Sequence, residues 1–133
     1  MAFVLDASIA VAWVVPTQAT PYTRSLRVRA RREPYHVPSI FVAEVTNVLV
    51  TLQRRAILSE TGAAAAADVL SRFAPIVHPI TLNVIDLRRL ANRYNLTAYD
   101  STYLALAMEL HLPIACGDRP LKAALKSAGV KLA

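Results

Sequence analysis

Residues 2–15 read AFVLDASIAVAWVV, so a single acidic residue, Asp6, lies between two apolar runs. The first run predicts a short buried strand, Phe3–Asp6, and Ser8 is expected to cap a helix that continues to Val15. An ionised carboxylate in such surroundings costs several kcal/mol unless something neutralises it. A metal ion is one candidate for that neutralising partner.

Three more acids stand alone in apolar or structurally specific settings, although the chain has only nine acidic residues in all. Glu44 interrupts an apolar sequence that begins at Ile40, Asp100 precedes an apolar helical segment, and Asp118 follows the apolar run that ends at Cys116. Together with Asp6, these carboxylates would form a site for a divalent cation if the fold brings them together.

Strand-like apolar runs alternate with helical patterns along the chain. Further strands are expected at Tyr35–Val37, Ile76–Ile80 and Ile114–Cys116, with an edge strand at Val130–Leu132. Further helices are expected at Pro21–Arg32, Ser39–Arg55, Ser59–Phe73, Thr81–Tyr94, Thr97–Leu110 and Arg119–Ala128, with Ser39, Ser59, Thr81 and Thr97 as caps. The alternation predicts an α/β fold, a three-layer α/β/α sandwich with a mostly parallel central sheet. Sites in such sheets form at the carboxyl ends of strands, where Asp6 and Asp118 fall.

The composition is typical of one compact domain over residues 1–133. Hydrophobic residues make up 55% of the chain and charged residues 18%, which argues against disorder. The single cysteine, Cys116, excludes an intramolecular disulfide and a cysteine-rich zinc site, as expected in a reducing cytosol. No apolar run approaches the roughly 20 residues that span a bilayer, and no secretory leader is recognised. We therefore expect a cytoplasmic protein without a membrane segment.

The net charge of +6 favours nucleic acid or an acidic protein as a partner. Five of the fifteen basic residues lie between Arg24 and Arg32, and Arg24, Arg27 and Arg31 are expected to share one helical face. Three interpretations of that face remain open: an ordinary solvated surface, a track for an RNA backbone, or a contact for an acidic partner segment.

The two acids at strand ends have structural alternatives. Asp6 would serve as the turn residue that ends its strand. Asp118 precedes Arg119-Pro120 and would cap the last helix.

The two helical acids have alternatives as well. Asp100 completes a capping box that starts at Thr97. Glu44 is expected well inside its helix and would form an ion pair with an arginine. The buried stripe expected beside it consists of Phe41, Val45, Val48 and Leu52.

Four motifs resemble, in the same order, those of PIN-domain ribonucleases. They are Leu5-Asp6-Ala7-Ser8, Glu44-Val45-Thr46-Asn47, the stretch LTAYDSTYLALA at residues 96–107, and Gly117-Asp118-Arg119-Pro120-Leu121. The resemblance covers essentially the whole chain and is strongest for the VapC-type toxins of toxin–antitoxin pairs. It implies that Asp6, Glu44, Asp100 and Asp118 form the catalytic and metal-binding site, with Ser8 and Asn47 as polar support.

The same resemblance implies a chemistry and a set of partners. The expected reaction is hydrolysis of RNA phosphodiester bonds, with Mg²⁺ or Mn²⁺ as cofactor and with 5′-phosphate and 3′-hydroxyl products. Such hard cations prefer carboxylate and water oxygens, and both one-ion and two-ion arrangements are compatible with these residues. The implied partners are RNA, a VapB-type antitoxin whose helix binds a groove formed by the early helices, and a second copy of the chain in a homodimer.

One position departs from the family pattern, which usually has Thr or Ser two residues before the last acid. Cys116 stands there instead, and a thiol is a weaker hydrogen-bond partner than a hydroxyl, so the orientation of Asp118 is the least determined part of the site. Two alternative functions remain. One is a catalytically weakened PIN-like module that binds RNA or protein. The other is an Asp-based phosphotransfer domain, one type of which expects a second Asp where this chain has Ser8.

Overall fold

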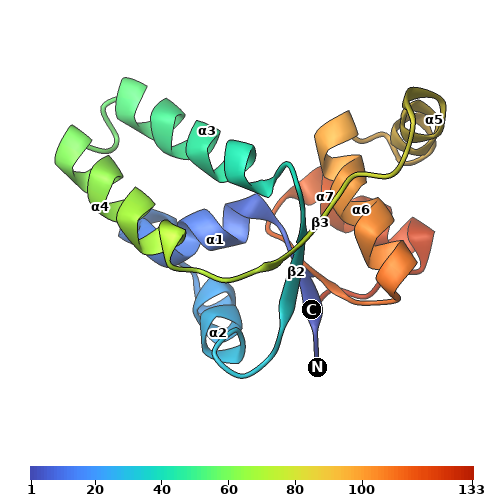
Figure 1. Cartoon of the computed structure of the whole chain (residues 1–133), viewed down its shortest axis with the longest axis horizontal. Helices are drawn as coiled ribbons and strands as arrows, with labels where there is room; N and C mark the ends of the chain where they lie inside the picture. The colour runs from blue at the N-terminus through green and yellow to red at the C-terminus, as the bar shows by residue number, and fades with distance from the viewer.

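The computed structural model describes residues 1–133 and shows a small sheet between two groups of helices (Figure 1). The strands are β1 (Phe3–Leu5), β2 (Tyr35–Pro38), β3 (Ile76–His78) and β4 (Ile114–Ala115). The helices are α1 (Ala7–Val14), the 3-10 turn η1 (Pro16–Gln18), α2 (Pro21–Arg29), α3 (Phe41–Arg54), α4 (Glu60–Ser71), α5 (Val84–Tyr94), α6 (Ala98–Leu110) and α7 (Arg119–Ala128). Helices α1 to α4 lie on one side of the sheet and α5 to α7 on the other, which confirms the predicted three layers.

The sheet has the order β3-β2-β1-β4, and every neighbouring pair of strands is parallel. All four carboxyl ends therefore point to the same edge. Asp6 follows β1 directly, and Asp118 follows β4 after two intervening residues. The edge strand predicted near Val130 is reduced to one parallel bridge between Leu132 and Ile114.

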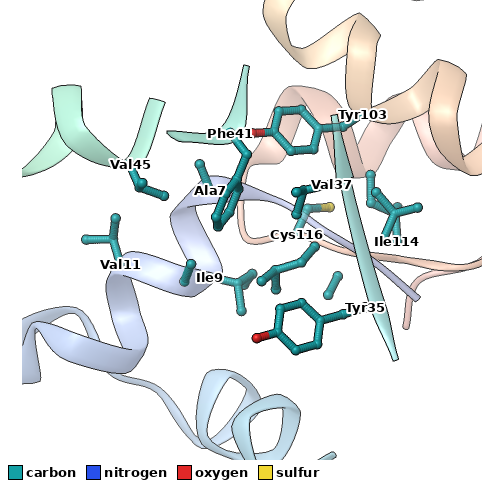
Figure 2. Close-up of a cluster of buried hydrophobic side chains, with 14 of the residues drawn as sticks. Ala7, Ile9, Val11, Tyr35, Val37, Phe41, Val45, Tyr103, Ile114 and Cys116 are labelled. Carbon is teal, nitrogen blue, oxygen red and sulfur yellow. The ribbon is translucent and has the colours of Figure 1, made fainter. Parts of the chain in front are cut away.

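The core surrounds β1 and α1. Figure 2 shows side chains from α1, β2, α3 and α6 packed together, among them Ile9, Val11, Tyr35, Val37, Phe41, Val45 and Tyr103. Burying each of the larger side chains contributes roughly 1.5–3 kcal/mol, so α1 is firmly held against the sheet and α3. Although α1 is almost entirely apolar, no helix is both long and apolar enough to cross a membrane.

The predicted start of α3 and the predicted end of β3 are both wrong. The backbone N–H of Ser39 donates to the carbonyl oxygen of His78 (2.8 Å), which extends the pairing of β2 with β3. Ser39 therefore does not cap a helix, and α3 begins only at Phe41. Strand β3 ends at His78, because Pro79 has no N–H to continue the ladder.

Two of the four later caps were predicted correctly. The side chains of Ser59 and Thr97 accept hydrogen bonds from backbone N–H groups of α4 and α6, at 3.0 and 3.1 Å. The cap predicted at Thr81 is wrong, because Asn83 accepts from the N–H of Asp86 (2.9 Å). Both residue types favour such positions, so the sequence alone does not decide between them.

The basic helix α2 is shorter than predicted. It ends at Arg29, whose guanidinium lies 3.0 Å from the Glu33 carboxylate, and Pro34 follows. Because a residue before proline is disfavoured in the helical conformation, the helix cannot continue through Glu33, and residues 30–32 form a turn instead. Arg31 consequently does not share a helical face with Arg24 and Arg27.

Candidate functional site

Asp6 is buried at the carboxyl end of β1. It occupies the N-cap position of α1, but its carboxylate accepts no hydrogen bond from the backbone of that helix. Instead, the Ser8 hydroxyl donates to Asp6 Oδ2 at 2.5 Å. The prediction that Ser8 caps the helix is therefore wrong. Ser8 lies in the first turn, where its hydroxyl contacts the buried acid.

Glu44 lies in the first turn of α3, not well inside the helix as predicted, because α3 begins late. Its side chain is half-buried, and no basic group lies within ion-pair distance, so the alternative of a structural ion pair is wrong. Its Oε1 atom is buried without any hydrogen-bond partner. A buried polar atom without a partner costs about 1–3 kcal/mol, more when charged, and within the chain the Tyr103 hydroxyl is a neighbouring group that could relieve it.

Asp100 is the third residue of α6. Its backbone N–H donates to Thr97 Oγ1, but its carboxylate makes no return bond to the Thr97 backbone. Only half of the predicted capping box is therefore formed, and the Asp100 carboxylate is left available for another role.

Asp118 caps α7, as its structural alternative predicted. Its Oδ2 accepts a hydrogen bond from the backbone N–H of Leu121 (3.2 Å). Cys116 is fully buried and makes no hydrogen bond to Asp118. The helix cap, and not the side chain at position 116, thus orients this carboxylate through one oxygen.

The fold brings these four acids into one electrostatic cluster. Burial raises the pKa of Asp6, and the nearby charge of Asp118 raises it further. Burial and the charges of Asp6 and Asp100 raise the pKa of Glu44 to about 7. Burial and the charges of Asp6 and Asp118 raise the pKa of Asp100 to about 6. None of the ion pairs in the protein includes these residues, so their repulsion has no basic partner to relieve it.

The sequence matches the PIN domain over residues 3–124, nearly the full chain. The chain belongs to the PIN domain family.

Solved structures share this PIN fold at low sequence identity. PAE2754 from Pyrobaculum aerophilum is 24% identical with a TM-score of 0.65, covering 93% of this chain and 87% of that one. FitAcB from Neisseria gonorrhoeae is 18% identical with a TM-score of 0.66, and the match covers 99% of this chain and 96% of that one. VapBC2 from Rickettsia felis, solved with a DNA fragment from its promoter, is 14% identical with a TM-score of 0.66. The match covers 100% of this chain and 98% of that one. No protein of curated function matches the chain significantly.

Tyr103 is a further residue of this PIN domain's acidic cluster. It is fully buried, and its hydroxyl has no hydrogen-bond partner. Burial and the charges of Glu44, Asp6 and Asp100 raise its pKa far above the usual range for tyrosine. Figure 2 shows its ring extending from α6 with the hydroxyl directed toward the side where Phe41 lies. Its spacing of three residues from Asp100, which puts both on one helical face, was the signal in the sequence.

The donor types of the cluster suit a hard divalent cation, since they are carboxylate oxygens with uncompensated charge. The unpartnered Oε1 of Glu44 is an atom that such an ion would satisfy. As the side chains stand, however, no three acidic, histidine or cysteine side chains converge closely enough to ligate one ion. Binding would therefore require side-chain rotations that draw the carboxylates together.

Asn47 lies one helical turn after Glu44 on α3 and is exposed. Its side chain makes no hydrogen bond to any of the four acids, so nothing in this arrangement shows the predicted polar support. The amide is free to bind another group.

Arg24 and Arg27 line a hollow of about 570 Å³ between α1, α2 and α4, and none of the four acids contributes to its wall. The guanidinium of Arg27 donates to the backbone oxygen of Trp13 at 2.6 Å. Arg31 does not line this hollow. Arg24 and Arg27 thus belong to a second surface, distinct from the acidic cluster, whereas Arg29 of the same helix pairs with Glu33.

Proposed function

We propose that this protein is a metal-dependent endoribonuclease that hydrolyses RNA phosphodiester bonds and acts as the toxin of a toxin–antitoxin pair, with residues 1–133 as one nuclease domain. The observation that carries the proposal is the cluster of four carboxylates without a basic partner at the carboxyl edge of the parallel sheet. Membership of the PIN family, whose members are in general nucleases, supports it. So does the fold-level similarity to FitAcB and VapBC2.

Asp6, Glu44, Asp100 and Asp118 would hold Mg²⁺ or Mn²⁺, which when bound supplies an activated water and positive charge beside the scissile phosphate. The chain prepares two of these ligands by hydrogen bonds to a single oxygen: Ser8 holds Oδ2 of Asp6, and the Leu121 N–H holds Oδ2 of Asp118. Fixing one oxygen restricts the rotation of the carboxylate and so orients the other.

Glu44 and Asp100 have a different role in the proposed metal site from that of Asp6 and Asp118. With pKa values near 7 and 6, they hold protons in part at neutral pH, which lessens the repulsion in the free protein. They lose these protons when a cation takes over the neutralisation.

The test is cleavage of single-stranded RNA by purified protein across a Mg²⁺ and Mn²⁺ titration. Asp6→Asn, Glu44→Gln and Asp100→Asn should each reduce cleavage by at least about tenfold, since even mutation of a residue that only supports a metal ligand commonly reduces activity by about 10–100-fold. Asp86→Asn is the matched control, because Asp86 is also the third residue of its helix and donates its N–H to a cap, but lies outside the cluster. The control should cleave at the wild-type rate.

Wild-type protein that cleaves no RNA with either ion would contradict the proposal. RNA binding without cleavage would favour the alternative function, a catalytically weakened module that binds RNA. One observation supports that alternative: the four acids do not converge closely enough to ligate one ion. Cleavage retained by an amide variant would remove that residue from the site.

We propose a VapB-type antitoxin as the protein partner, docked with an acidic amphipathic segment in the hollow between α1, α2 and α4. Arg24 and Arg27 supply the positive charge there, while the small residues Ala65 and Ala66 of α4 let a helix approach closely. Charge reversal, Arg24→Glu with Arg27→Glu, should abolish co-purification with a co-expressed antitoxin and leave RNA cleavage intact. Unchanged co-purification would place the antitoxin elsewhere.

We also propose a homodimer that buries α5. No residue of this helix is buried in the single chain, and Val84 and Ile85 are 83% and 60% exposed. Light scattering should give twice the mass of one chain, and Val84→Asp should return the mass to that of one chain. A wild-type mass of 14.5 kDa would contradict this assembly.

A further inference from the structure

A hollow of about 480 Å³ adjoins the acidic cluster, with Glu44 and Asp100 in its wall. The rest of its lining is uncharged and consists of Ile40, Ala43, Asn47, Val48, Thr97 and Tyr99. In Figure 1 the N-terminal parts of α3 and α6, which with their caps supply these residues, lie on either side of the chain as it leaves β2. A ligand held at the acids thus has a neighbouring space suited to an uncharged group.

Tyr99 provides an open aromatic face in this hollow. It immediately precedes Asp100 in α6 and is 60% exposed. Its ring pairs with no other aromatic ring and carries no cation, and its hydroxyl makes no hydrogen bond. The fold therefore makes no use of this ring, although leaving it in water forgoes the stabilisation that its burial would provide.

The opposite wall comes from α3. Asn47 and Val48 follow Glu44 by three and four residues, so the three side chains share one face of the helix. Val48 was predicted to belong to the buried stripe, but Leu49 is buried in its place and Val48 is left half-exposed beside the hollow. The amide of Asn47 offers both a donor and an acceptor.

We infer that this hollow is a nucleobase subsite, in which the base next to the scissile phosphate stacks on Tyr99, packs against Val48 and hydrogen bonds with Asn47. The inference rests on the proposed function, in which RNA is the substrate. The lining has no lysine or arginine, which disfavours a phosphate and favours a planar uncharged group. A base inside a duplex cannot expose its face, so the subsite selects single-stranded RNA.

The test measures base stacking separately from cleavage. The parent protein is the Asp6→Asn variant, whose altered residue lies outside the hollow. It is titrated in Mg²⁺ with a short single-stranded RNA that contains 2-aminopurine. The fluorescence of this base is quenched when it stacks on a ring. Adding Tyr99→Leu should abolish the quenching and weaken binding roughly five- to a hundredfold, the range for loss of one stacked base. Tyr99→Phe keeps the ring and should behave as the parent. An RNA with an abasic nucleotide at the same position should bind the parent and the Tyr99→Leu variant equally.

Quenching that survives Tyr99→Leu, or an equal loss of affinity for the abasic RNA, would overturn the subsite. A Tyr99→Leu effect confined to binding of the antitoxin would overturn it as well and would assign the hollow to a protein partner. Failure of the proposed function gives a different result. Wild-type protein would then cleave no RNA while Tyr99-dependent quenching persisted. An absence of RNA binding would reject both.

Discussion

Removing the charges of Glu44 and Asp100 should stabilise the metal-free protein at pH 8 and have little effect at pH 4. The perturbation is the double variant Glu44→Gln/Asp100→Asn, in which each amide keeps the shape of the acid it replaces. Both acids have raised pKa values in the folded chain, so the folded state binds more protons than the unfolded state between about pH 4 and pH 7. Stability therefore falls as the pH rises through this window.

The magnitude follows from the two pKa values. A rise from 4.5 to about 7 for Glu44, or from 3.8 to about 6 for Asp100, corresponds to roughly 3 kcal/mol at full effect. Each side chain is about half exposed, so solvent screening reduces this, and we expect about 1 kcal/mol for each. With about 3–4 °C of Tm per kcal/mol for a domain of this size, the variant should melt about 7 °C above wild type at pH 8.

The assay is thermal unfolding followed by circular dichroism in EDTA at pH 4, 5, 6, 7 and 8. The difference between variant and wild type is the quantity to follow, because other groups also titrate. Burial and His78 lower the pKa of His36, which makes stability rise with pH and opposes the acids in either protein alone. A difference in Tm that stays constant from pH 4 to pH 8, or a variant less stable than wild type at pH 8, would refute the reasoning.

Three further results are expected. Tyr103→Phe should leave the Tm of the metal-free protein equal or higher, because it removes a buried hydroxyl that has no hydrogen-bond partner. The same variant should bind Mn²⁺ more weakly in calorimetry, and an unchanged Mn²⁺ affinity would show that this hydroxyl is not part of the site. Asp118→Ala should lower stability by about 1 kcal/mol through loss of the α7 cap, whereas Asp118→Asn should not, and equal melting of the two variants would contradict the cap. Cys116 should react with a thiol reagent far more slowly in the native protein than in denaturant, because it is fully buried and burial raises its pKa to about 12. Equal reaction rates would show that the thiol is accessible.

The places of Asp6 and Asp118 at the ends of strands could be predicted from the sequence because their signals are local. Asp6 stands alone between apolar runs, and the parallel arrangement implied by alternating strands and helices sends the end of every strand to one edge. Asp118 follows from the same rule, and its role as a cap could be seen from the proline two residues later. In both cases a few neighbouring residues decide the position.

The parts that could not be predicted depend on where a helix starts. The backbone N–H of Ser39 bonds to His78, a long-range contact that the sequence does not reveal, and α3 begins only at Phe41. The later start places Glu44 in the first turn. The buried stripe keeps Phe41, Val45 and Leu52 as predicted but takes Leu49 in place of Val48, so the half-exposed Val48 beside Tyr99 could not be assigned from periodicity alone.

The pairing of β1 with β4 has a consequence for when the acidic cluster can form during synthesis of the chain. It unites Asp6 with Asp118, and a cut of the chain anywhere between them divides the cluster. Separating residues 1–72 from 73–133, for example, leaves two acids on each piece. Under the proposed function, a ribosome-bound chain cannot cleave the RNA around it until almost all of its residues have emerged. Two such pieces, fused to proteins that dimerise, would regain activity only on reassembly, which makes this fold a natural split reporter.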